Sequence, residues 1–179
     1  ESGYFATPFL SASVMGFHEA MPTNASNFTW WATNTGTGTG ATGNLEFDSS
    51  TYSVAAFEGK TFTLTDTSGL TITYEFKSTG LNGAILPNGN TAAFIQTNFG
   101  STLTKVATAI GHSNGHNGSI TATKVHPSIN LAQAVAGENG NTIVSTNLTP
   151  AQLTPTSFIG GTSTFGEGRD LQVYLVRDS

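Results

Sequence analysis

Residues 61–76 read TFTLTDTSGLTITYEF, and this stretch decides the fold. Apolar side chains occupy every second position on either side of an Asp-Thr-Ser-Gly turn at 66–69. This alternation predicts two antiparallel strands that each bury one face, while the other face carries threonine and almost no charge. The alternating apolar residues are Phe62, Leu64, Leu70, Ile72, Tyr74 and Phe76.

The chain after this hairpin predicts a loop and one helix. Residues 78–90 are rich in Gly and Asn around Pro87, which is typical of a loop, and a short apolar run follows at 92–96. Ser101 or Thr102 could cap a helix that ends at about Gly111. Its apolar residues share one face and predict a stripe that packs on the sheet: Leu103, Val106, Ala107 and Ile110.

Further strands are predicted at 120–125 and 130–135, followed by a chain reversal at 136–141. The Thr-Pro pairs at 149–150 and 154–155 are expected to interrupt any regular element before Phe158. The predicted fold class is therefore α+β: a mostly antiparallel β-sheet with one packed amphipathic helix and an extended N-terminal arm. The α+β module is expected to span residues 58–161.

The segments on both sides of the module are predicted to be extended. Residues 1–57 lack a sustained period and are expected to form the arm, with a Gly- and Thr-rich loop at 36–43 and a short β segment at 52–57. Adjacent aromatics on a strand point to opposite faces, so one of Trp30 and Trp31 is available to another chain unless the loop covers both. Residues 162–179 form a tail with a predicted strand at 171–176, which needs a sheet edge in its own subunit or in a neighbour.

The order of these segments resembles a small α+β module of structural proteins in tailed-bacteriophage virions. The resemblance covers residues 59–161 and rests on the hairpin, the helix at 103–110, the strands at 118–123 and 131–135, and the Gly-Gly pair at 160–161. In that module a segment like TxxxAGxxGNT links the last two strands, and residues 133–142 match it apart from Val135 and Glu138. The resemblance implies a head decoration or tail accessory subunit with no catalytic role.

Composition limits the classes of partner. Charged residues make up only 9% of the 179 residues, against about 25% in typical soluble proteins, so hydroxyls and amides must supply solubility. The net charge is −5 and the six basic residues are scattered, which argues against nucleic-acid binding. Cysteine is absent, and no run approaches the roughly 18 apolar residues of a membrane helix, so neither thiol chemistry nor a membrane partner is predicted.

Two groups of residues could suggest chemistry, but each has a simpler interpretation. His112 and His116 would face the same side of a continuous helix, as in a metal site, yet Asn-Gly turns follow Gly111, so solvated turn residues are expected instead. Glu46 with Asp48, and Glu167 with Asp170, are acid pairs that could serve a glycosidase, although solvated loops explain them as well. No Gly-x-Ser-x-Gly sequence occurs, and the sequence predicts no catalytic residue, cofactor or metal ion.

The expected function is therefore that of a virion structural protein, a capsid decoration or tail accessory subunit in a virion or other extracellular setting. Its partners would be other virion proteins and copies of itself. The alternatives are a carbohydrate-binding or adhesin module that recognises surface glycans, and a subunit of a non-viral extracellular filament. The predicted contact residues are apolar and lie outside the module: Phe5, Phe9, Phe28, Trp30, Trp31, Leu171, Val173 and Leu175.

Overall fold

The hairpin at 61–76 forms as the alternation predicts. Its strands are β2 (Thr61–Thr65) and β3 (Thr71–Lys77), with Leu64 opposite Ile72. Phe62, Leu64, Tyr74 and Phe76 are fully buried. Leu70 differs because it lies in the turn, where its amide donates to the carboxylate of Asp66, and it is half exposed.

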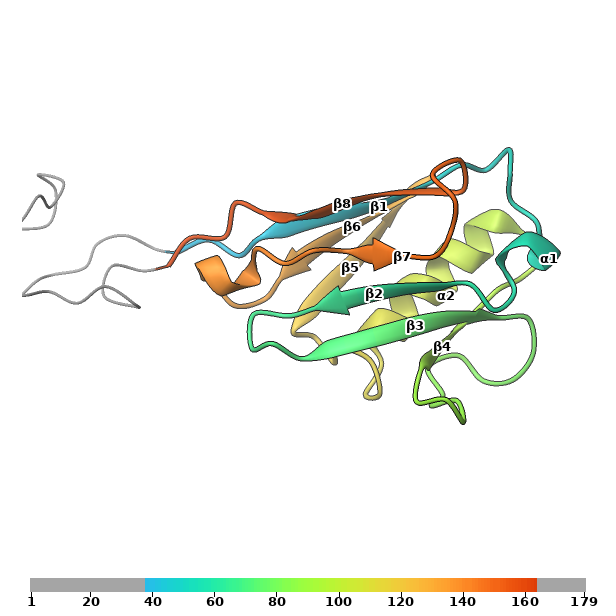
Figure 1. Cartoon of the computed structure of the whole chain (residues 1–179), viewed down its shortest axis with the longest axis horizontal. Coiled ribbons are helices and arrows are strands. Elements are labelled where there is room, and N and C mark those ends of the chain that lie inside the picture. Colours follow the sequence, from blue (N-terminus) through green and yellow to red (C-terminus); the bar gives the residue numbers. More distant parts are fainter. Residues whose placement is uncertain (1–37, 164–179) are drawn as a thin grey trace, which may run out of the picture. The chain divides into compact units, whose positions relative to one another are not determined.

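The computed structural model describes residues 38–163, which form one compact unit. This unit contains two four-stranded sheets where the sequence predicts one (Figure 1). The hairpin sheet has the order β4-β3-β2-β7, with β3 and β4 parallel, and its outer strands are β4 (Thr91–Phe94) and β7 (Ser145–Thr146). The second sheet, called the terminal sheet because it holds the first and last described strands, has the order β5-β6-β1-β8. Its strands are β1 (Thr42–Phe47), β5 (Ile120–Val125), β6 (Ser128–Gln133) and β8 (Leu153–Ile159).

The predicted module boundary at residue 58 falls inside this compact unit. β1 lies between β6 and β8 in the terminal sheet, and its Leu45 and Phe47 are buried. The Gly- and Thr-rich run leads directly into this strand, so the part of it from residue 38 onward is not a linker. The strands that pair with β1 lie more than 80 residues away along the chain. A local sequence pattern therefore cannot predict this pairing.

Two further local predictions were wrong. Residues 52–57 form no strand, because the hydroxyl of Ser53 accepts a hydrogen bond from the amide of Ala56 and caps the short helix α1 (Val54–Phe57). Pro155 does not interrupt β8. Since β8 is at the edge of its sheet, the amide that proline lacks need not pair there.

Helix α2 (Phe99–Gly111) ends where the sequence predicts, but its N-cap is Asn98, whose side chain accepts from the amide of Ser101. The helix contacts β5 in the terminal sheet and β4 in the hairpin sheet, and so it bridges the two sheets. Its buried residues are Thr102, Leu103, Val106, Ala109 and Ile110.

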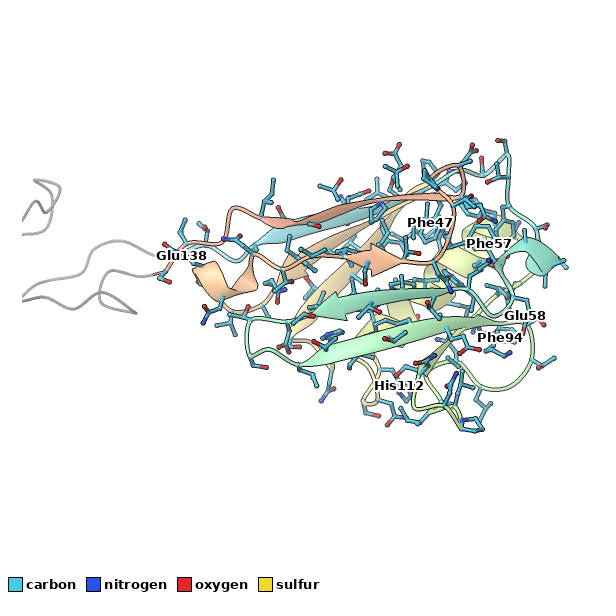
Figure 2. All side chains as sticks on the ribbon, viewed as in Figure 1. Phe47, Phe57, Glu58, Phe94, His112 and Glu138 are labelled. Carbon is cyan, nitrogen blue, oxygen red and sulfur yellow. The ribbon has the colours of Figure 1, made fainter. Side chains whose placement is uncertain are left out.

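Aromatic rings fill the core between the sheets near α1. Phe57 and Phe76 have ring centroids 5.5 Å apart in an edge-to-face arrangement, and Phe47 lies within 6.3 Å of both. Figure 2 shows Phe47 and Phe57 together at this end of the unit. The core thus joins β1, α1 and β3, which are separate in the sequence.

Candidate functional site

The first and last described segments meet at one end of the compact unit. The amide of Thr39 donates to the carbonyl of Thr162 at 3.0 Å, and the amide of Thr162 donates to the carbonyl of Thr39 at 3.0 Å. The two threonine hydroxyls lie 2.8 Å apart, and the Thr39 hydroxyl donates to the carbonyl of Gly160 at 2.7 Å. The first and last residues of the described range, 38 and 163, therefore lie close to this bridge.

The side chain of Asn141 holds the outgoing strand at this end. Its carbonyl oxygen accepts from the amide of Gly161 at 2.8 Å, and its amide donates to the carbonyl of Gly161 at 3.0 Å. A Cβ at Gly161 would lie 2.4 Å from the carbonyl oxygen of Gly137, so only glycine fits. We call this group the exit end; it consists of Thr39, Asn141, Gly160, Gly161 and Thr162.

The turn beside the exit end includes the 3-10 helix η1 (Glu138–Gly140). Glu138 is exposed there, and its amide donates a 3.4 Å hydrogen bond to the hydroxyl oxygen of Ser163. Figure 2 labels Glu138 at this end, far from Phe57. The exit end is therefore held by hydrogen bonds among backbone groups and the side chains of Thr39, Asn141 and Thr162.

All eight predicted contact residues lie outside the described residues: Phe5, Phe9, Phe28, Trp30, Trp31, Leu171, Val173 and Leu175. The acid pair of Glu167 and Asp170 also lies outside them. The described residues that precede the C-terminal contact residues and follow the N-terminal ones in the chain belong to the exit end, where Thr39 pairs with Thr162.

Gln133 is a buried polar residue that the sequence reasoning missed. Its carbonyl oxygen accepts from the amide of Thr67 at 3.1 Å, and its amide donates to the carbonyl of Thr65 at 2.9 Å, so it connects β6 to the hairpin. The strand alternation could have indicated its burial. Gln133 comes two residues after Leu131 and four after Ile129, so all three side chains lie on the same buried face of β6. Gln133 and Asn141 both lie in the segment 133–142 that carries the resemblance.

His116 is buried, contrary to the expectation of a solvated turn residue. Its Nδ1 lies 2.7 Å from the hydroxyl of Tyr74, and its Nε2 lies 3.3 Å from the carbonyl of Leu70. A neutral ring that donates from Nε2 and accepts at Nδ1 satisfies both contacts. His112 is partly exposed and hydrogen bonds the amide of Asn114 at 3.2 Å, so the two imidazoles serve different local contacts.

Burial lowers the pKa of His116 below its ordinary 6.5, because the charged form loses solvation. The unfolded chain binds a proton near pH 6.5 and the folded chain does not, so the free energy of unfolding should fall as the pH drops below about 6.5. Urea unfolding at pH 7.5 and pH 5.5 measures this loss. His116→Gln should remove most of the difference, whereas His126→Gln, at an exposed position, should keep it.

Equal pH dependence in the His116→Gln variant and the unaltered protein would contradict this assignment. The buried carboxylate of Asp66 titrates at lower pH. Burial opposes ionisation of Asp66, but hydrogen bonds from Ser119 and Ser68 lower its pKa below 3.8. The stability that Asp66 contributes is therefore lost only as the pH falls through and below that value.

Glu46 and Asp48 line a hollow of about 360 Å³ at the far end of β1. Hydrogen bonds from the hydroxyl and amide of Ser50 lower the pKa of Asp48, so this carboxylate stays ionised and anchors its own loop. A glycosidase needs one carboxyl group that holds its proton, and this arrangement gives Asp48 the opposite tendency. The hollow is lined by Glu46, Phe47, Asp48, Ser49, Pro127, Pro150, Ala151 and Thr154.

Within residues 38–163, no group of three or more His, Asp or Glu side chains is placed to hold a metal ion. No helix among the described residues is long and apolar enough to cross a membrane. No family model, curated protein or solved structure matches this chain.

Proposed function

We propose that this chain is a structural subunit of a tailed-bacteriophage virion, of the capsid decoration or tail accessory type. It stabilises the particle by contacts with other virion proteins and with copies of itself. The observation that carries the proposal is the exit end, where hydrogen bonds of 2.8 to 3.1 Å hold Thr39 and Thr162 together. A rigid module thereby presents two apolar segments from one place.

The distribution of polar groups in the module agrees with such a role. Threonine pairs on the outer face of the hairpin sheet hydrogen bond to each other, with Thr63 and Thr73 at 2.9 Å and Thr65 and Thr71 at 2.9 Å. Among the described residues, every buried side-chain N or O atom has a hydrogen-bond partner. The module supplies a stable body, and the flanking aromatics supply the contact area, about 150–250 Å² for each one buried.

Removal of residues 1–37 tests the proposal. The shortened chain begins at Gly38, keeps β1 and the Thr39 bridge, and should retain the circular dichroism spectrum of the full chain. We expect its incorporation into particles to fall more than tenfold, because Phe28, Trp30 and Trp31 are lost. The measurement is the amount of chain that co-sediments with particles assembled in cells producing the remaining virion proteins.

A full-length Leu81→Ser variant is the matched control, since Leu81 is 78% exposed in the loop before β4. It should incorporate as well as the unaltered chain. Undiminished incorporation of the chain that starts at Gly38 would contradict the proposed role. Deletion of residues 1–43 would be uninformative, because it removes the buried Ala41 and the start of β1.

A further inference from the structure

The outward edge of β4 is already occupied by its own loop. The amide of Gly83 donates to the carbonyl of Ala92 at 2.8 Å, and the amide of Ala92 donates to the carbonyl of Ala84 at 2.8 Å. The amide of Phe94 donates to the side chain of Asn82. No further strand can pair with β4 without displacing this loop.

The segment that leads into β7 lies along the outer edge of β8. The amide of Phe158 donates to the carbonyl of Thr142 at 2.9 Å, and the amide of Val144 donates to the hydroxyl of Ser157 at 3.2 Å. Pro155, also in β8, has no amide to leave unpaired. These contacts close the gap between the two sheets on this side.

The outward edge of β5 is open among the described residues. Ser119 accepts from the amide of Ala134, and the register then directs the backbone groups of Thr121 and Thr123 toward β6. The backbone groups of Ala122 and Lys124 therefore point away from the sheet, and within residues 38–163 no backbone hydrogen bond reaches them. β5 contains neither proline nor a bulge that would block pairing.

Helix α2 offers threonine side chains beside this edge. Lys124 Nζ reaches the helix at the carbonyl of Gly100 and the hydroxyl of Thr104, at 2.7 and 3.2 Å. The hydroxyls of Thr104 and Thr108 donate to carbonyls one turn earlier in the helix, at 3.1 and 2.9 Å. Their hydrogen-bonding capacity is thus partly used within the helix, which leaves their methyl groups for contact with apolar side chains.

We propose that β5 accepts residues 171–176 of a second copy of this chain as an added antiparallel strand. In this segment Leu171, Val173 and Leu175 share one face, which would lie on the α2 side, and Gln172 and Tyr174 share the other. The inference rests on the proposed function, since it names the surface through which copies of the subunit bind one another. In this inference the six residues of β5 pair with residues 171–176, the last predicted strand, of a neighbouring copy.

Chain length places the added strand in another copy. An antiparallel strand that places Gln172 or Tyr174 opposite Thr123 puts Leu171 beside Lys124 or one step beyond Val125, which is seven or nine residue steps along the sheet from Ser163 by the observed registers. That is about 23–30 Å along the strands and about 19 Å across four strand spacings, or roughly 30–35 Å in total. The eight residue steps from Ser163 to Leu171 span at most about 29 Å. In these registers a chain falls short of its own β5, which it can reach in the parallel direction, and parallel pairing is slightly less stable.

Disulfide trapping tests the pairing, because the natural chain has no cysteine. Full-length Thr123→Cys protein is mixed with full-length Gln172→Cys or Tyr174→Cys protein and oxidised. Directly opposed residues in antiparallel strands have Cα atoms about 4.5–5.5 Å apart, within the range of a disulfide. We expect at least tenfold more covalent heterodimer than when Thr42→Cys protein replaces Thr123→Cys protein in the mixture. Thr42 is exposed on the same face of the terminal sheet as Thr123, but it lies in the inner strand β1, which an added strand cannot reach.

Val173→Pro in the Tyr174→Cys protein should abolish the heterodimer, because proline disrupts the added strand. Equal yields from Thr123→Cys and Thr42→Cys would overturn the inference. An internal disulfide in the Thr123→Cys/Tyr174→Cys double variant, without dimer, would also overturn it, since the strand would then come from the same chain. If no heterodimer forms but incorporation into particles still depends on residues 1–37, this inference alone is refuted and the proposed function stands.

Discussion

Phe76→Ala should lower the free energy of unfolding by about 3–5 kcal/mol, since removal of a buried phenylalanine ring leaves a cavity that the surroundings cannot fill. Phe76 is fully buried, and its ring lies 5.5 Å from Phe57 and 5.6 Å from Phe62, measured between centroids. The lost ring contacts residues from α1 and β2 at once. Chemical denaturation followed by far-ultraviolet circular dichroism, which reports secondary structure, measures the change in the free energy of unfolding.

Leu81→Ala is the control for this prediction, because Leu81 is 78% exposed. It shortens an apolar side chain at an exposed position and should change the free energy of unfolding by less than about 0.5 kcal/mol. A loss below about 1 kcal/mol for Phe76→Ala would mean that the aromatic cluster is not the centre of the core. A typical domain has only about 5–15 kcal/mol of stability, so the expected loss is a large fraction of the total.

Gly40→Ala should cost about 2–3 kcal/mol, the upper range for overpacking. A Cβ at Gly40 would lie 2.3 Å from the carbonyl oxygen of Gln133 and 3.7 Å from that of Val135. The obstacle is the Gln133 carbonyl, a backbone group that cannot rotate away as a side chain could. The strain would fall beside the 2.8 Å hydrogen bond from the amide of Gln133 to the carbonyl of Ala41, where the chain enters the terminal sheet.

Gly111→Ala is the matched control, since a Cβ at this last residue of α2 meets nothing within 4 Å. It should stabilise the protein by about 0.4–1 kcal/mol, because alanine restricts the unfolded chain and favours a helix. Thermal unfolding of both variants gives the comparison. Equal stability of Gly40→Ala and the unaltered chain would show that the entry to β1 is a loose linker after all.

The hairpin and α2 could be predicted because their signals are local. Alternation at 61–76 and the apolar stripe at 103–110 each act over a few neighbouring residues. The core contains most of the residues that these patterns marked, but Leu70 is half exposed and Ala107 is only partly buried, whereas Ala109 is buried. The cap of α2 was placed a few residues late because Asn98, Ser101 and Thr102 are all acceptable at that position. The backbone conformation before α2 decides which of these side chains hydrogen bonds a free amide in the first turn of the helix.

β1 and His116 could not be predicted in this way. The residues that pair with β1 come from β6 and β8, and the hydrogen bond between Asn44 and Asn130 joins positions 86 apart in sequence. The Asn-Gly turns around His116 suggested solvent, yet Tyr74 from the hairpin covers the ring. In both cases the deciding partner is distant along the chain.

The exit end illustrates the same division for the candidate site. The segment 133–142 was marked by its glycines and asparagines, but the role of Asn141 depends on its contact with Gly161, 20 residues later. The predicted contact residues on either side of the module lie outside the described residues, so their role stays a prediction. What the structure adds is the place to which both flanking segments attach.

The amino-acid order by itself determined the α+β class, the hairpin, the end of α2 and the low charge, since periodicity and composition act over a few neighbouring residues. Only the tertiary structure decided that there are two sheets, that residues 38–57 belong to the compact unit, and that β5 keeps an open edge among residues 38–163. These features depend on which distant segments meet, and that is set by the burial of apolar faces and the pairing of backbone groups across the whole unit.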